Sequence, residues 1–297
     1  MTTANTNEEA AITSETKGQL FIIHLNNPKH LNSLTIPQFE RIAELLIEAN
    51  NSKETAITLF TSSGEYFSTG ANIKTVSQNV DQSAKFYFDT ITSRNLYLVS
   101  LLCQHKKLLV CALNGPVIGL SASLMLLCDL IYARDPLPLS SPGGLGINSN
   151  TTSVNTKNKQ KQPFISLPFN NISLTNEGSV SATLIHRIGL SKAMEIIGLS
   201  KKLTLTEMEK LGLVNQIFQF ENTDKFNDHV IGYLNHELQG LDKGMIFENK
   251  MLLRSQFNKL VKNIVLDEGL LGLDRWVGNY PQNAFKEIMS GKRQHKL

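Results

Sequence analysis

The sequence predicts an α/β protein in which buried strands alternate with helices. The central observation is residues 111–129, where an apolar strand runs into Asn114-Gly115-Pro116 and then, from Gly119, into an apolar helix. The second is the order strand, helix, strand over residues 19–60, which is typical of a sheet with right-handed crossover connections. Of the 297 residues, 41% are hydrophobic and 19% are charged, which is ordinary for a globular enzyme.

The individual elements follow from periodicity and from the residues that begin or end them. Thr35 can cap one helix, with Pro37 in its first turn, and Thr206 is expected to cap a short helix that ends at Gly212. Strands or extended pieces are predicted at 19–25, 56–60, 110–113, 129–133, 164–169 and 214–218. Further helices are predicted at 82–103, 119–128, 179–188, 191–199, 224–238, 245–261, 266–276 and 285–289.

Composition divides the chain into a tail, a core and a helical region. Residues 1–17 are polar and acidic, and we expect a disordered tail. Residues 18–220 are expected to form the core, with a flexible surface insertion at 136–162 that is rich in Ser, Asn, Thr, Lys and Gln. Residues 221–297 are expected to form a C-terminal helical region. The polar stretch 74–81 is expected to be a mobile loop.

Charge, hydropathy and cysteine spacing exclude several classes of protein. A net charge of +3 with scattered Lys and Arg does not favour binding to nucleic acid. No apolar run reaches the roughly 18–20 residues that cross a bilayer, so no membrane span is expected. Three cysteines without a CxxC spacing favour buried free thiols over disulfides or a metal site. Lys106 and Lys107 are expected to be solvated.

Two glycine turns suggest a binding site for a substrate oxygen. Gly119-Leu120 begins the apolar helix, and Gly70-Ala71 follows the predicted strand 56–60. Glycine permits close approach of a ligand, and the first amides of a helix have no partner within the helix. Two such amides from separate turns can form an oxyanion hole, although plain buried turns are the alternative reading.

The two segments together resemble the crotonase (enoyl-CoA hydratase/isomerase) superfamily: FSTGANI after a strand, then NGPVIGLSASLMLLCDLIYA, within a match over residues 20–219. The resemblance implies a crotonase fold, in which repeated ββα units form a spiral core with a C-terminal helical region. It implies an acyl-CoA thioester substrate, no separate cofactor or metal because CoA is part of the substrate, and a homotrimer or homohexamer. It also implies that the amides of Ala71 and Leu120 form the oxyanion hole and that Gly119 lies against the substrate.

The acid/base residues decide which reaction such a fold catalyses. In the hydratase branch, two glutamates lie at positions that correspond to Ser123 and Phe169 here. Neither residue can act as a general base at neutral pH, so a hydratase is not expected. The dienoyl-CoA isomerase branch also keeps carboxylates at these positions and a third further on, so the two residues count against it as well.

Glu177 is the remaining candidate base. Its surroundings, NISLTNEGS, resemble the peroxisomal Δ3,Δ2-enoyl-CoA isomerases, in which this glutamate is the single catalytic base; Ser179 replaces a glycine of that pattern. Asn95, on the predicted helix 82–103, is expected near the acyl pocket as a supporting substrate-binding residue. The resemblance therefore predicts an isomerase that shifts the double bond of 3-enoyl-CoA to trans-2-enoyl-CoA in β-oxidation.

Three alternatives stay open. The chain can be a dienoyl-CoA isomerase-like paralogue, or a non-catalytic paralogue that binds acyl-CoA or acts as a scaffold. Glu177 itself can be a carboxylate that only stabilises the start of a helix.

The last three residues of the sequence suggest a subcellular location. His295-Lys296-Leu297 resembles the C-terminal S-K-L peroxisomal signal, with His in place of Ser. Together with the fatty-acyl chemistry, it predicts the peroxisomal matrix and the peroxisomal import receptor as a partner.

Overall fold

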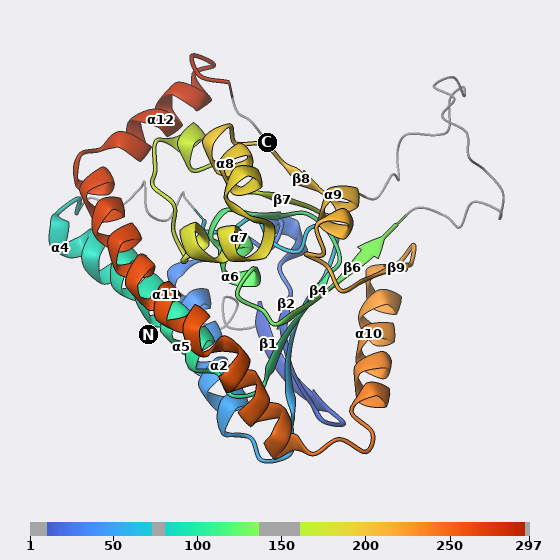
Figure 1. Cartoon of the computed structure of the whole chain (residues 1–297). Helices are drawn as coiled ribbons and strands as arrows, with labels where there is room; N and C mark the ends of the chain where they lie inside the picture. The colour runs from blue at the N-terminus through green and yellow to red at the C-terminus, as the bar shows by residue number, and fades with distance from the viewer. Residues whose placement is uncertain (1–10, 73–80, 137–160, 295–297) are drawn as a thin grey trace, which may run out of the picture.

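The computed structural model describes residues 11–72, 81–136 and 161–294, and a six-stranded sheet runs through its middle (Figure 1). The strand order is β1-β2-β3-β4-β6-β9. β1 pairs antiparallel with β2, and each later pair is parallel, as the predicted crossover connections require. The strands are β1 Ile12–Lys17, β2 Leu20–Leu25, β3 Ile57–Ser62, β4 Leu108–Leu113, β6 Leu130–Asp135 and β9 Gln216–Gln219.

Helices cover both faces of the sheet (Figure 1). Along β4, successive side chains point to opposite faces: Val110 packs in the cluster that includes helix α10, and Cys111 packs in the larger cluster that includes α2 and α5. The long helix α11 lies along α5. The α-helices are α2 Ile36–Asn51, α4 Ala84–Tyr87, α5 Ser93–Gln104, α6 Gly119–Met125, α7 Val180–Ile188, α8 Leu190–Gly198, α9 Leu205–Lys210, α10 Thr223–Glu237, α11 Lys243–Val277 and α12 Tyr280–Met289.

A small second sheet places the start of α6. It consists of β5 Val117–Ile118, β7 Phe164–Ser166 and β8 Leu203–Thr204, and β5 continues directly into α6. A π-helical turn, Phe88–Thr92, joins α4 to α5, and the 3-10 turns are Pro28–His30 and Asn170–Ile172. None of the described helices is long and apolar enough to cross a bilayer.

The expectation of a disordered tail over 1–17 is wrong for its last residues. Ile12–Lys17 form the edge strand β1, which is paired with β2 along its whole length. Ile12 is its only buried residue, so the strand carries little hydrophobic pattern and owes its order to main-chain pairing with β2. Residues 1–10 lie outside the described residues, as do 73–80 and 137–160, on which most of the loop and insertion predictions fall.

The two helices predicted at 245–261 and 266–276 are one helix of 35 residues, α11. Its buried face carries Lys250, Arg254 and Glu268, whereas Leu252 and Leu253 are 72% and 86% exposed. Lys250 and Arg254 both bind the carboxylate of Asp129, at 2.8 and 2.6 Å, which ties α11 to the end of the α6 segment. Because its buried face is partly ionic, hydrophobic periodicity does not reveal the continuous helix.

Two smaller predictions are also wrong. Lys107 is 1% exposed, because its ammonium donates to the carbonyl of Ser52 and the hydroxyl of Thr55 inside the protein, so it is not solvated. Thr204 caps α9, because Glu207, three residues later, returns a hydrogen bond to the Thr204 amide; Thr206 lies within the helix.

Candidate active site

The first predicted turn is held in place by hydrogen bonds on both sides of Ala71. The carbonyl of Gly70 accepts from the amide of Leu34, and the carbonyl of Leu34 accepts from the amide of Asn72, each at 2.8 Å. Gly70 has a φ of +83°, a conformation that favours glycine. The Ser68 hydroxyl accepts from the Gly70 amide at 3.1 Å. This pattern uses the amides beside Ala71, and we find no acceptor for the Ala71 amide among the described residues.

The second predicted turn lies directly against the first. Gly119 has a φ of +58° and turns β5 into α6, so Leu120 lies in the first turn of that helix. A Cβ added at Gly70 would stand 2.7 Å from the carbonyl oxygen of Ile118 and 3.4 Å from the amide nitrogen of Leu120. Across the described part of the chain, the Leu120 amide also has no acceptor. The structure therefore brings together the two turns that sequence reasoning paired.

Glu177 belongs to a loop that packs on the same helix. A Cβ added at Gly178 would lie 2.7 Å from the Cβ of Ser123 and 3.1 Å from a side-chain carbon of Leu120. The loop of Gly178 thus packs on α6 beside Leu120, whose amide has no acceptor among the described residues. Glu177, one residue before Gly178, therefore belongs to a loop that packs on the first turns of α6.

A chain of hydrogen bonds from α5 reaches the Glu177 carboxylate. Asn95 donates from Nδ2 to Oε2 of Glu177 at 2.9 Å. The Oδ1 of Asn95 accepts from Nε and Nη2 of Arg94, at 3.2 and 3.0 Å. Since a guanidinium can only donate, the Asn95 oxygen must face Arg94, which leaves its amide hydrogens for the carboxylate. Arg94 also lies over the ring of Phe39, 4.5 Å from its centroid.

These surroundings adjust the acidity of Glu177. Burial raises its pKa to about 7, while the charge of Arg94 and the Asn95 hydrogen bond lower it, and the carboxylate of Glu268 raises it. Part of the Glu177 surface faces a small cavity, yet protein atoms surround the carboxylate closely enough for burial to dominate. A carboxylate with a pKa near neutrality can both take up and release a proton.

The two positions that carry carboxylates in hydratases hold packing residues here. Ser123 is fully buried against Gly178, and Phe169 is 1% exposed. Neither side chain can act as an acid/base group at neutral pH, so Glu177 remains the candidate base of this site. No cluster of three or more His, Cys, Asp or Glu residues suited to a metal ion occurs within the described ranges.

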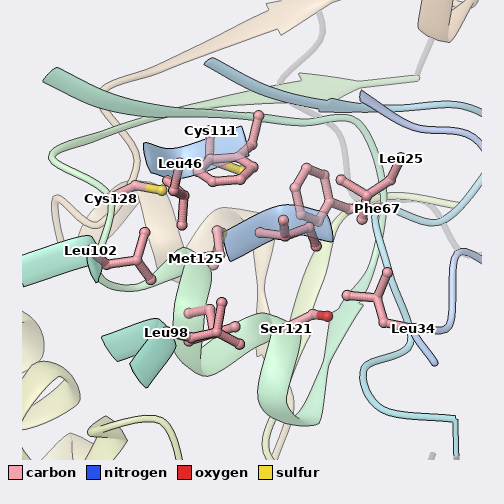
Figure 2. Close-up of a pocket in the computed structure, with 13 residues that line it drawn as sticks. Leu25, Leu34, Leu46, Phe67, Leu98, Leu102, Cys111, Ser121, Met125 and Cys128 are labelled. Carbon is pink, nitrogen blue, oxygen red and sulfur yellow. The ribbon is translucent and has the colours of Figure 1, made fainter. Parts of the chain in front are cut away.

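An apolar cavity adjoins the two turns. Figure 2 shows the side chains of Leu98 and Leu102 from α5 and of Met125 from α6 directed into it. Leu34 and Ser121 form its end nearest the turns, since Leu34 bonds to Gly70 and Ser121 follows Leu120. The full lining is Leu25, Leu34, Ile42, Leu46, Phe60, Phe67, Leu98, Leu102, Cys111, Ser121, Leu124, Met125 and Cys128.

Sequence reasoning missed two charged residues at this site, Arg94 and Glu268. Arg94 directly precedes Asn95 and so belongs to the same turn of α5. Glu268 lies on the buried face of α11, three residues after Val265 and seven after Val261. A lone carboxylate at a core-facing position of a helix is a signal that could have identified it, once α11 is treated as one helix.

Comparisons with known proteins show which proteins the chain is similar to. A family model described as enoyl-CoA hydratase/isomerase matches residues 15–143. The chain is 34% identical to the Delta(3,5)-Delta(2,4)-dienoyl-CoA isomerase of Saccharomyces cerevisiae over 94% of this chain and 96% of that protein. It is 30% identical to the 3,2-trans-enoyl-CoA isomerase of the same yeast, over 95% of each.

A solved structure supports the fold separately. An enoyl-CoA hydratase/isomerase from Pseudoalteromonas atlantica superposes with a TM-score of 0.75 at 17% identity, over 97% of this chain and 99% of that one. At 17% identity the similarity supports only the fold, and the predicted crotonase fold is confirmed.

Proposed function

Because the chain belongs to the enoyl-CoA hydratase/isomerase (crotonase) family, we propose that it is a Δ3,Δ2-enoyl-CoA isomerase that converts 3-enoyl-CoA into trans-2-enoyl-CoA. Its family and its yeast relatives make it an enzyme that isomerises carbon–carbon double bonds. The observation that carries the finer proposal is the packing of Gly178, the residue after Glu177, on α6, whose first turn holds the Leu120 amide, for which the described residues show no acceptor.

The proposed reaction needs one base and one oxyanion hole. The C2 protons of a 3-enoyl thioester are acidic, because the resulting anion is conjugated with both the carbonyl group and the double bond. The Glu177 carboxylate takes a C2 proton, and the electrons move into a dienolate whose oxygen accepts from the amides of Ala71 and Leu120. Glu177 then returns the proton to C4, which leaves the double bond between C2 and C3.

Asn95 and Arg94 support the base in this proposal. Their hydrogen bonds stabilise the ionised carboxylate and hold its Oε2, so that Oε1 is directed to the substrate. Ser123 and Phe169 cannot supply the acid/base pair that hydration needs to activate a water molecule, which favours isomerisation over hydration.

The apolar cavity is proposed to receive the acyl chain. Its walls are almost entirely hydrocarbon and sulfur, and it begins beside the turns that would hold the thioester. Cys111 and Cys128 lie in its wall, where burial raises the pKa of both thiols, so they act there as small apolar groups.

A dienoyl-CoA isomerase is the second candidate, and the yeast relative of that name motivates it. That reaction moves a proton from C2 to C6, two carbons further along the chain. The second buried carboxylate in the cavity of Glu177, that of Glu268, is the group that the structure offers for such a transfer. Its two oxygens already accept backbone hydrogen bonds, which favours the single-base reaction.

The experiment presents the purified full-length chain with 3-hexenoyl-CoA, 3,5-octadienoyl-CoA and trans-2-hexenoyl-CoA separately. Formation of the 2-enoyl thioester from the first substrate, faster than conversion of the dienoyl substrate, supports the proposal. Preferential conversion of 3,5-octadienoyl-CoA supports the second candidate. Accumulation of the 3-hydroxyacyl product from trans-2-hexenoyl-CoA would show that the chain is a hydratase. Binding of acyl-CoA without turnover means a non-catalytic paralogue.

The chain is also proposed to form a homotrimer or homohexamer. Leucines and methionines are exposed along α11, and more apolar residues are exposed on α7, which packs on α11, and on α8, which packs on α7. We propose that a second copy of the chain, which carries the same apolar surface, covers this surface. Sedimentation equilibrium tests it: a monomer at micromolar concentration would contradict the assembly. On these three helices and at the end of α8, the exposed apolar residues are Ile185, Leu190, Met194, Leu199, Met245, Met251, Leu252, Leu253, Leu260, Leu266, Leu270, Leu271 and Val277.

The peroxisomal matrix, with the import receptor as partner, completes the proposal. It is supported by β-oxidation chemistry and by the likeness of His295-Lys296-Leu297 to a targeting signal; these residues lie outside the described part of the chain. A fluorescent protein fused to the N-terminus should localise to peroxisomes and become diffuse when the three residues are deleted. An unchanged distribution would exclude the signal.

A further inference from the structure

Glu268 is a buried carboxylate that the proposed reaction does not use. It lies on α11 and is 6% exposed. Its Oε2 accepts from the amide of Ser179 at 2.7 Å, and its Oε1 accepts from the amide of Ser181 at 2.9 Å. These two amides begin helix α7, immediately after the Glu177 loop. A residue from a distant helix therefore takes over the capping of α7.

The start of α7 needs such an external partner. Ser179 adopts a φ of +66°, where a serine cannot cap the helix in the usual extended conformation, and its own hydroxyl has no partner within the described structure. Gly178 before it has a φ of +72°. Glycine adopts the left-handed region with little strain, whereas Ser179 in that region costs about 1 kcal/mol or more unless the surroundings fix it.

This turn sets the direction of Glu177. Gly178 rests on Ser123 and Leu120 on one side, and the Glu268 carboxylate holds the next amides from the other side. Glu268 and Glu177 also line the same small cavity, with Gly269 and Gly272 of α11 forming part of its wall. Helix α11 thus bonds the end of this loop that adjoins α7 through Glu268, and its beginning at Ser173 through Arg275.

We propose that Glu268 is a positioning residue, which fixes the Gly178–Ser179 turn and so directs the Glu177 carboxylate toward the substrate. The inference rests on the proposed function, in which Glu177 is the base. Glu268 touches neither the substrate nor the transferred proton. It couples the C-terminal helical region to catalysis.

Charge gives Glu268 a second, measurable effect. Its negative charge raises the pKa of Glu177, against the opposing influence of Arg94 and the Asn95 hydrogen bond from α5. Removal of that charge should lower the pKa of Glu177. A purely structural role for Glu268 would change protein stability without moving this pKa.

The experiment compares Glu268→Gln with Asp267→Asn, a neighbouring exposed carboxylate on the same helix. With 3-hexenoyl-CoA, we expect kcat of Glu268→Gln to fall about 10-fold or more with a small change in KM, because glutamine can accept with only one oxygen. The pH midpoint of kcat/KM should move to lower pH. Asp267→Asn should match the wild type in both measurements.

A readout that does not need turnover separates this inference from the proposed function. The 13C resonance of the Glu177 carboxyl group, assigned by its loss in Glu177→Gln, is titrated in the wild type and in Glu268→Gln. A lower midpoint in Glu268→Gln supports the inference even in a chain that does not isomerise. An unchanged midpoint, together with an unchanged kcat, overturns it. If Glu268→Gln does not fold, Glu268→Asp takes its place, because aspartate keeps the charge but has a shorter side chain. Glu268→Asp should lower kcat while the titration midpoint of Glu177 stays near the wild-type value. A wild-type kcat in Glu268→Asp overturns the inference.

Discussion

Asn95 donates a hydrogen bond of 2.9 Å to Glu177, a residue 82 positions later in the chain. The bond joins α5 to the loop that precedes α7. Because Arg94 occupies the other end of the Asn95 amide, the bond has one possible polarity and favours the ionised form of the glutamate.

Asn95→Leu should therefore disfavour the ionised form of Glu177, which is the form that can take a proton, and shift its titration. A hydrogen bond to a charged group is worth about 1.5–3 kcal/mol, so kcat/KM should fall roughly 10- to 100-fold. The pKa of Glu177 should rise, because the lost hydrogen bond lowers it. The pH profile of kcat/KM, which should move its midpoint to higher pH, checks this. Gln104→Leu, at the exposed end of the same helix, is the control.

Glu177→Gln should stabilise the fold at neutral and higher pH. The pKa of Glu177 is about 7 in the fold against an ordinary value of 4.5, so ionisation of the folded protein costs up to about 3 kcal/mol at pH 8. The wild type loses this stability as the pH rises from about 4.5 through 7, whereas the variant does not. Urea unfolding should show the difference at pH 8 and its disappearance below pH 4.5. Glu48→Gln, an exposed change, should show no such dependence.

Gly178→Ala should abolish most activity through displacement of the Glu177 loop. The new Cβ would stand 2.7 Å from Ser123 in addition to the strain of a positive φ. Gly212→Ala is a control, because Gly212 caps the end of α9 with a similar φ of +65° and no atom outside its chain neighbours lies within 4 Å of the added Cβ. Both variants should lose about 1 kcal/mol of stability from backbone strain, and only Gly178→Ala should lose turnover. Equal activity of the two would show that the contact with α6 does not matter.

Leu102→Phe should shorten the range of accepted acyl chains. Leu102 lines the apolar cavity from α5 and is 2% exposed, so a larger ring must occupy cavity space. Turnover of long-chain 3-enoyl-CoA should fall at least about 10-fold more than turnover of 3-hexenoyl-CoA. Leu101→Phe, one position along and outside the cavity lining, is the control. A uniform loss across chain lengths would place the acyl chain elsewhere.

The parts of the structure that depend on local pattern could be predicted from the sequence. The strand–turn–helix at Gly119 and the turn at Gly70 are such features, since glycines and an apolar run specify them. Their convergence was inferred through a family resemblance, because no local pattern reports on contacts between distant turns.

The rest depends on tertiary partners. β1 is a polar edge strand that β2 orders, so its residues resemble a tail when considered alone. Glu268 is buried because Ser179 and Ser181 offer it two amides, and Lys250 and Arg254 because Asp129 pairs with them. These buried charges give α11 a polar inner face, which the sequence pattern assigns to solvent.

The central claim is that Glu177 is the only base of a double-bond isomerase. Its most direct test is the rate at which Glu177→Gln converts 3-hexenoyl-CoA to the 2-enoyl thioester, with Ser123→Ala and Phe169→Leu measured beside it. The amide keeps the size of the side chain but cannot take a proton, so the rate should fall by about 10⁴-fold with acyl-CoA binding retained. The other two variants should change turnover only modestly. A wild-type rate in Glu177→Gln would contradict the account and require another carboxylate.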